Sequence, residues 1–112
     1  MFRSDWKSCV IAKSGQTSAE CDLGQPYRFI LIDIPTIDTA TVTVQVARES
    51  GGTFRNLYVT DAADGGNNKV IADSGTGAFM WMVEAGGVQY IKMYASAAQS
   101  TAAVTFYIRG LD

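Results

Sequence analysis

Hydrophobic and polar residues alternate with a period of two along most of this chain. In residues 41–46, valine occupies every second position, at Val42, Val44 and Val46, and polar residues stand between. The same alternation recurs near the C-terminus, in residues 102–109. This period is typical of half-buried strands, and no segment shows a sustained helical period. The pattern therefore predicts an all-β protein.

Turn residues divide the sequence into about eight short strands. Pro35 cannot donate to a ladder, so it should close the strand before it. The glycines at positions 51 and 52 predict a hairpin. Residues 24–26 and 85–87 predict two further turns, and residues 61–77 have the least regular pattern. The expected strands are residues 7–13, 19–23, 27–34, 41–48, 54–60, 78–84, 88–95 and 102–109, with 69–72 as a short addition.

Strands of this number and spacing predict an antiparallel β-sandwich with a jelly-roll-like arrangement. An immunoglobulin-like sandwich is the alternative, although its Cys…Trp…Cys arrangement is missing. We expect a single domain over residues 1–112, with residues 1–6 as an N-terminal arm, because 112 residues suffice for one core.

Two of the expected strands carry apolar residues on both faces. Residues 27–34 place isoleucines on one face and Tyr27, Phe29 and Leu31 on the other. Residues 78–83 also have two apolar faces, with Met80 and Met82 on one and Phe79, Trp81 and Val83 on the other. The second faces are covered either from within the chain or by another protein, since contiguous apolar patches mark interaction sites. The candidates for such an interface are Trp6, Phe79, Met80, Trp81 and Met82.

The two cysteines, Cys9 and Cys21, lie symmetrically about Gly15. If the flanking segments pair as a hairpin, the two residues are directly opposite each other, close to disulfide geometry. Two buried free thiols and a disulfide both remain open.

Charge and composition exclude several classes of function. The net charge is −2, so there is no basic field for nucleic acid. The N-terminal residues lack the apolar region of a signal peptide, and no apolar run approaches the ~20 residues of a membrane helix. We therefore expect synthesis in the cytoplasm and no membrane partner.

The residues also argue against catalysis. The chain has no histidine, which rules out Ser-His-Asp and Cys-His arrangements, and it has no phosphate-binding or dinucleotide motif. Asp33, Asp38 and Glu84 stand beside turns, where solvated carboxylates are usual. We expect a non-enzymatic protein without catalytic residues, cofactor-binding residues or metal ligands.

One loop and one residue class leave alternatives open. The segment from Asp61 to Asn68 is rich in oxygen ligands and glycine, which suits calcium, but it departs from the EF-hand spacing. Exposed aromatic rings on a β-sandwich can also bind sugars. The candidate platforms are Tyr27, Tyr58, Trp81, Tyr90, Tyr94 and Tyr107.

A characteristic order of strand and turn motifs runs through residues 31–46, 50–54, 57–58, 87–92 and 105–108. This order resembles that of small β-sandwich structural proteins of tailed bacteriophages. Some of these decorate the capsid exterior, and others belong to tails or fibres. The likeness covers most of the chain from about residue 10 onward, and no catalytic residue belongs to the pattern.

This resemblance implies a virion component that binds the outer surface of a capsid lattice and contacts other virion proteins or further copies of itself. A tail- or fibre-associated module that binds a carbohydrate or receptor is the alternative, and a domain of a cellular adhesin is a third.

Overall fold

The protein is built from β-strands in the part of the chain that the structure describes. The computed structural model describes residues 3–61, 66–69 and 71–112. These residues contain no helix and therefore no helix that could cross a membrane. The all-β prediction is confirmed. The strands are β1 (Lys7–Ile11), β2 (Cys21–Ala47), β3 (Arg55–Asn56), β4 (Tyr58–Asp61), β5 (Gly66–Lys69), β6 (Ile71–Ala95) and β7 (Val104–Leu111).

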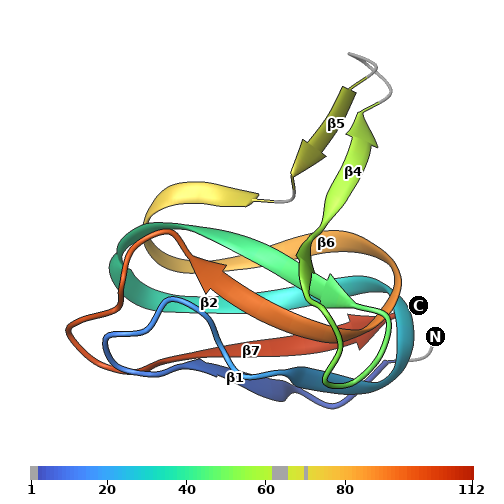
Figure 1. Ribbon diagram of the computed structural model, residues 1–112, viewed down its shortest axis with the longest axis horizontal. Coiled ribbons are helices and arrows are strands. Elements are labelled where there is room, and N and C mark those ends of the chain that lie inside the picture. Colours follow the sequence, from blue (N-terminus) through green and yellow to red (C-terminus); the bar gives the residue numbers. More distant parts are fainter. Residues whose placement is uncertain (1–2, 62–65, 70) are drawn as a thin grey trace.

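Five strands form one antiparallel sheet. Its order is β1-β7-β2-β3, and β6 also pairs with β2. β4 and β5 form a separate antiparallel pair, from Tyr58↔Lys69 to Asp61↔Gly66. Figure 1 shows this pair projecting away from the large sheet, which curls so that parts of β2 and β6 lie on both sides of the interior.

β2 and β6 bend together at a first corner. The register passes from Asp22↔Tyr90 to Tyr27↔Val88, so β2 has extra residues around Gly24, whose φ is 91°. The predicted turn at residues 24–26 is therefore a bulge inside β2. The predicted turn at residues 85–87 is likewise a bulge inside β6, with positive φ at both its glycines. Bulges of this kind let one strand pass from one layer to the next.

A second corner lies at Pro35. The prediction that this residue ends its strand is wrong, because β2 continues through it to Ala47. The ladder is nevertheless shifted here, from Thr36↔Gly77 to Ala40↔Gly75. A bend can hold a proline because fewer ladder hydrogen bonds are required there. Gly77 is needed opposite, since a Cβ on it would overlap the carbonyl oxygen of Pro35.

The two corners make β6 pair twice with β2. Ile91 pairs with Cys21 near the start of β2 and with Val46 near its end. The sheet therefore curls around its own interior. This topology confirms neither the expected count of about eight strands nor the jelly-roll or immunoglobulin-like arrangement.

The core fills the inside of this curl. Ile30, Ile32 and Ile34 are fully buried, as their alternation predicts. Val42 and Val44, in the part of β2 that follows the corner at Pro35, are buried with them. The core also includes Val104, Phe106 and Ile108, the face of β7 that the alternation indicates.

Three local predictions need correction. Residues 7–13 and 19–23 do not form a hairpin ladder: β1 pairs with β7, and one backbone bond of 3.3 Å joins Ala19 N–H to Val10 O. The hairpin predicted at the glycines 51 and 52 is confirmed for only two residue pairs, Gln45↔Asn56 and Val46↔Arg55. After β3 the chain no longer pairs with β2 and forms β4, which belongs to the other sheet. Residues 66–69 and 71–77 belong to strands instead of an irregular loop. β1 and residues 71–77 pair with strands that are distant in sequence, β7 and β2, and local alternation does not reveal such pairing.

Candidate interaction surface

The outward face of the sheet carries a row of large side chains across four adjoining segments. Leu31 of β2 pairs with Arg109 of β7 on one side and with Met82 of β6 on the other. Residues directly opposite in an antiparallel ladder point to the same face. The guanidinium carbon of Arg109 lies 4.6 Å from the centre of the Trp6 ring, which extends the row to the N-terminal arm.

A second row lies on the same three strands, two residues away along each of them. Asp33 pairs with Tyr107 on one side and with Met80 on the other. Tyr107 and Met80 are about half exposed, at 47% and 51%. Together the two rows place aromatic, methionine and charged side chains on one face, the mixture that is enriched at protein interfaces.

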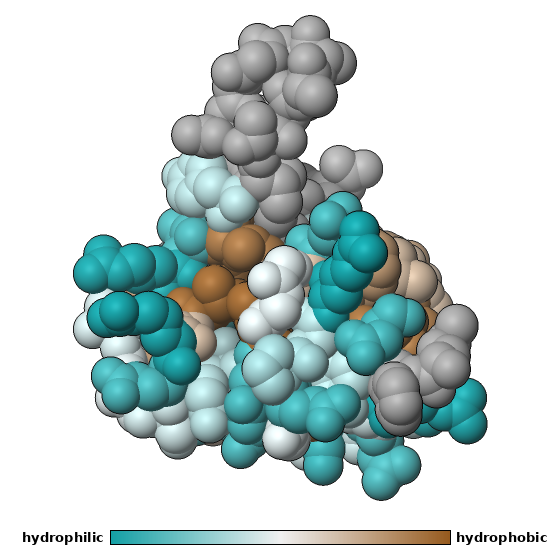
Figure 2. Space-filling model, turned by 90° about the vertical axis from the view of Figure 1, so that its right-hand side faces the viewer, coloured by the Kyte–Doolittle hydropathy of each residue, from teal (hydrophilic) through white to brown (hydrophobic). Residues whose placement is uncertain are grey.

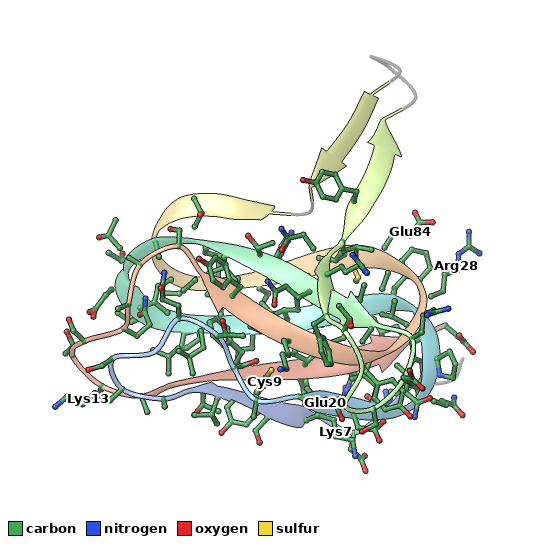
Figure 3. All side chains as sticks on the ribbon, in the orientation of Figure 1. Lys7, Cys9, Lys13, Glu20, Arg28 and Glu84 are labelled. Atoms are coloured by element: carbon green, nitrogen blue, oxygen red, sulfur yellow. The ribbon has the colours of Figure 1, made fainter. Side chains whose placement is uncertain are left out.

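A shallow hollow borders the same face. Its volume is about 280 Å³, and its lining is almost wholly apolar: Phe29, Met82, Leu111 and Asp112. Arg28 and Glu84, which Figure 3 labels near the bend of β6, both adjoin Phe29: the guanidinium carbon of Arg28 lies 5.2 Å from the centre of its ring, and Glu84 pairs with Phe29 in the ladder. The hollow thus has an apolar floor with charged side chains near its rim.

The N-terminal arm is held in place along β7. Ser4 N–H donates to the carbonyl of Gly110 at 2.9 Å, and Gly110 N–H donates to Ser4 Oγ at 2.8 Å. Arg3 forms a bridge with Leu111. These contacts fix the chain on both sides of Gly110 and so position Trp6 on the outward face.

Of the five predicted interface residues, three lie on this face. Trp6, Met80 and Met82 are exposed there, Met82 to 56%. Trp81 instead pairs with buried Ile32 and packs against the core. Phe79 lies two residues before Trp81 and therefore on the same face of β6, but its side chain is 39% exposed. Whether they contact a partner stays a prediction.

The sequence interpretation missed the contribution of β7. Tyr107, Arg109 and Leu111 supply one side of the surface, in alternation with the buried residues Phe106 and Ile108. The alternation itself could have identified them as one face. Only the pairing of β7 between β1 and β2 shows that this face adjoins Leu31.

A larger hollow of about 470 Å³ lies between the β6 bend and the turn after β2. Its lining is mixed and includes no aromatic residue: Pro26, Val46, Ala47, Arg48, Glu49, Thr53, Arg55, Gly87, Val88 and Gln89. Figure 2 shows the side of the molecule where the β6 bend lies, with brown hydrophobic surface surrounded by teal hydrophilic side chains. This hollow offers no stacking platform for a sugar ring.

The aromatic residues proposed as sugar platforms are scattered. Tyr27 is buried, and Trp81 packs against the core. Tyr58 and Tyr107 are exposed, but they belong to β4 and β7, which lie in different sheets. These four aromatics are therefore not assembled into one cleft, and the remaining two, Tyr90 and Tyr94, are half-buried on β6.

Cys9 and Cys21 are both buried and free. They meet inside the curled sheet, where Cys9 pairs with Phe106 and Cys21 pairs with Ile91. Cys9 Sγ lies 3.0 Å from Ser18 Oγ. Hydrogen bonding with the Cys21 thiol lowers the pKa of Cys9 to about 7, against burial, and Ser18 adds to this effect. The same bond, together with burial, raises the pKa of Cys21.

Three carboxylates at the protein surface hold turns and loops. Asp38 accepts bonds from Thr101 Oγ1 at 2.7 Å and Thr101 N–H at 3.1 Å, which lower its pKa. Glu20 accepts bonds from Ser50 Oγ and the next backbone N–H, with the same effect on its pKa. Asp22, bonded to Gln89, behaves likewise. Their bonds are structural and do not form a paired acid–base site.

The predicted calcium loop falls largely outside the described residues. Residues 62–65 are not described, and only the strand positions of its ends, in β4 and β5, are known. Over the described ranges there is no group of three or more Cys, Asp or Glu side chains that could hold a metal.

Comparison with known proteins gives a structural likeness. No protein-family model matches the chain, and no curated protein matches it. The crystal structure of the SPBc2 prophage-derived protein YomS is similar with a TM-score of 0.56 at 14% identity, covering 100% of this chain and 96% of that chain. A chain of the Cyanophage Pam1 capsid asymmetric unit has a TM-score of 0.33 at 15% identity, covering 96% and 84%. The likeness to YomS shows a shared fold, whereas the second score does not establish one.

Proposed function

We propose that this chain is a non-enzymatic structural protein of a tailed-phage virion that decorates and reinforces the outer surface of the capsid. It would be made in the host cytoplasm and then join the particle. The outward face of the sheet, with Trp6, Leu31, Tyr107, Arg109 and Met82, is the surface we assign to capsid binding.

The observation that carries this proposal is the outward row built on Leu31. Ladder hydrogen bonds hold the backbone at Leu31, Arg109 and Met82, and Trp6 of the N-terminal arm packs against Arg109. Arg109 and the exposed aromatic and methionine side chains provide both apolar area and a charged contact. Such a preorganised surface loses little entropy when it binds.

The fold supports the same proposal. YomS, which shares it, is described as a prophage-derived protein. We also infer that the curled sheet works as a jelly-roll-like pair of layers, because the bulged corners let β2 and β6 contribute to both. A rigid two-layer body suits a protein whose role is to add contacts between capsid subunits.

Reinforcement follows from mass action. A protein that binds only where neighbouring capsid subunits meet binds the assembled shell and not its dissociated parts, and it therefore shifts the equilibrium toward the shell. No chemical step is required.

Co-sedimentation with capsids tests the proposal. Particles of the phage that encodes the chain, prepared without it, are mixed with purified protein and pelleted. We expect saturable binding and a higher temperature of capsid disruption. Tyr107→Lys should abolish binding, because it places a flexible charge in the centre of the outward face. Tyr58→Lys is the matched control, since Tyr58 is exposed on β4, outside that face.

Two results would overturn the proposal. In the first, the protein stays in the supernatant at every concentration when it is mixed with capsids, but a polysaccharide column retains it. That result would favour the carbohydrate-binding alternative. The other is binding that Tyr107→Lys and Tyr58→Lys reduce equally, which would remove the outward face from the explanation.

A further inference from the structure

Residues 79–83 of β6 form an open edge of the large sheet. In the described chain these residues pair with β2 alone, from Ile34↔Phe79 to Ile30↔Val83. Residues further along β6 differ, since Ile91 pairs with β2 on both sides. One side of residues 79–83 thus presents backbone N–H and C=O groups without a described strand against them.

Among the described residues, this edge lacks the protection that sheet edges usually have. Natural edge strands carry lysine, proline or a covering segment that prevents pairing with another chain. The opposite edge, β1, has Lys7, and Ala19 donates a backbone bond to its Val10. Residues 78–83 contain no charge and no proline.

The exposed side chains of this edge are apolar. Phe79, Met80 and Met82 are 39%, 51% and 56% exposed. Methionine adapts its shape to a partner surface. An uncharged, apolar edge with open hydrogen-bonding groups fits an extended strand of the same composition.

We propose that two copies of this chain pair edge to edge through residues 79–83 of β6, antiparallel, about a two-fold axis at Trp81. In this register Met80 of one copy lies opposite Met82 of the other, and Phe79 lies opposite Val83. Such an interface is isologous, so each contact occurs twice.

Backbone geometry and charge select this register. Positive φ at Gly77 and Ala78 ends the straight segment on one side, and positive φ at Gly86 ends it on the other. Centring the pair on Trp81 sets Glu84 opposite the small residue Ala78. A shift that centred it on Met82 would set Glu84 opposite Met80 and leave the carboxylate against an apolar side chain.

Pairing would join the outward faces of two copies. A two-fold axis perpendicular to the sheet keeps both faces on the same side, so the Leu31–Met82 row of one copy continues into that of the other. This deepens the proposed function by naming the second copy as a partner, but dimerisation is a property of the purified chain and is tested without capsids. An interface in which five residues of each copy pair is smaller than a standard protein interface, which buries about 1,600 Å². The dimer should therefore be weak, and its fraction should depend on protein concentration.

A charge exchange tests both the edge and the register by analytical ultracentrifugation over a concentration series. The parent chain should show a reversible monomer–dimer equilibrium. Met80→Lys with Met82→Lys sets lysine opposite lysine twice and should weaken the dimer about tenfold or more. Met80→Lys with Met82→Glu sets lysine opposite glutamate twice and should restore the dimer.

Tyr107→Lys is the control on the same face but away from the edge, and it should leave the dimer unchanged. All variants are compared by circular dichroism and thermal midpoint, and the lysine–glutamate variant controls for folding at the same positions. A parent chain that is monomeric throughout, or a dimer that the two lysines do not weaken, would overturn the inference. Equal weakening by both double variants would overturn the register. Tyr107→Lys protein that dimerises but does not bind capsids separates this inference from the proposed function.

Discussion

The guanidinium group of Arg109 lies over the ring of Trp6, 4.6 Å from its centre. This contact joins the N-terminal arm to β7 at the row that runs through Leu31 to Met82. Trp6 is 38% exposed, so part of its ring remains available to a partner. The cation–π contact therefore orients an aromatic side chain that is still open on the outward face.

Trp6→Ala should weaken capsid binding more than it weakens the fold. An exposed cation–π contact contributes about 0.5–1 kcal/mol, whereas aromatic anchors at interfaces often contribute 2 kcal/mol or more, on the order of a thirtyfold change in affinity. Binding is measured by co-sedimentation and stability by urea unfolding. Tyr58→Ala serves as the control. Loss of stability in proportion to loss of binding would show that Trp6 acts only within the fold.

Gly110→Ala should destabilise the protein. The ring of Tyr27 occupies the position where a Cβ on Gly110 would lie, and both residues are buried. Overpacking of a core costs about 1–3 kcal/mol. Gly75→Ala is the matched control, because a Cβ there meets nothing within 4 Å and its φ is not positive. Urea unfolding should show a lower midpoint for Gly110→Ala alone; equal midpoints would mean that the Tyr27 ring moves aside freely.

The alternation of residue types was sufficient to predict an all-β fold and much of the core. Ile30, Ile32 and Ile34 are buried, and Met80 and Met82 are exposed on the other face, as their periodicity indicates. Period-two patterns depend only on which face a residue occupies, and that is a local property.

The pairing of strands could not be predicted in the same way. Pro35 and the glycines at residues 24–26 and 85–87 predict strand ends, but each lies within a long bent strand. A bulge and a turn use the same residue types, because both need positive φ or lack a ladder bond. Which one forms depends on the strand opposite, and that strand is distant in sequence.

The two thiols should be free but unreactive in the folded protein. Cys9 and Cys21 are 2% and 3% exposed. A pKa of about 7 would make Cys9 nucleophilic at neutral pH, but burial denies access to reagents. Titration with a thiol reagent should find no reactive thiol in the native state and both after unfolding in guanidinium without reductant. Fewer thiols after unfolding, restored by prior reduction, would indicate a disulfide.

The carboxylate of Asp38 should make stability depend on acidic pH. Bonds from Thr101, and additionally from Ser100, hold its pKa below the ordinary value of 3.8 in the folded state. The unfolded chain therefore binds the proton more readily, and the stabilisation is complete above the unfolded pKa and lost as pH falls through the folded one.

Asp38→Asn should therefore lower stability near neutral pH and flatten its decline below about pH 4. The comparison is the difference in urea midpoint between variant and parent from pH 7 to pH 2.5, because Glu20 and Asp22 contribute a decline of the same sign to both. Asp33→Asn is the control: Asp33 is exposed on the outward face, and no hydrogen bond to its side chain is found in the described chain. A parent and an Asp38→Asn variant whose midpoints differ by the same amount at every pH would show that the Thr101 bonds to Asp38 do not depend on its charge.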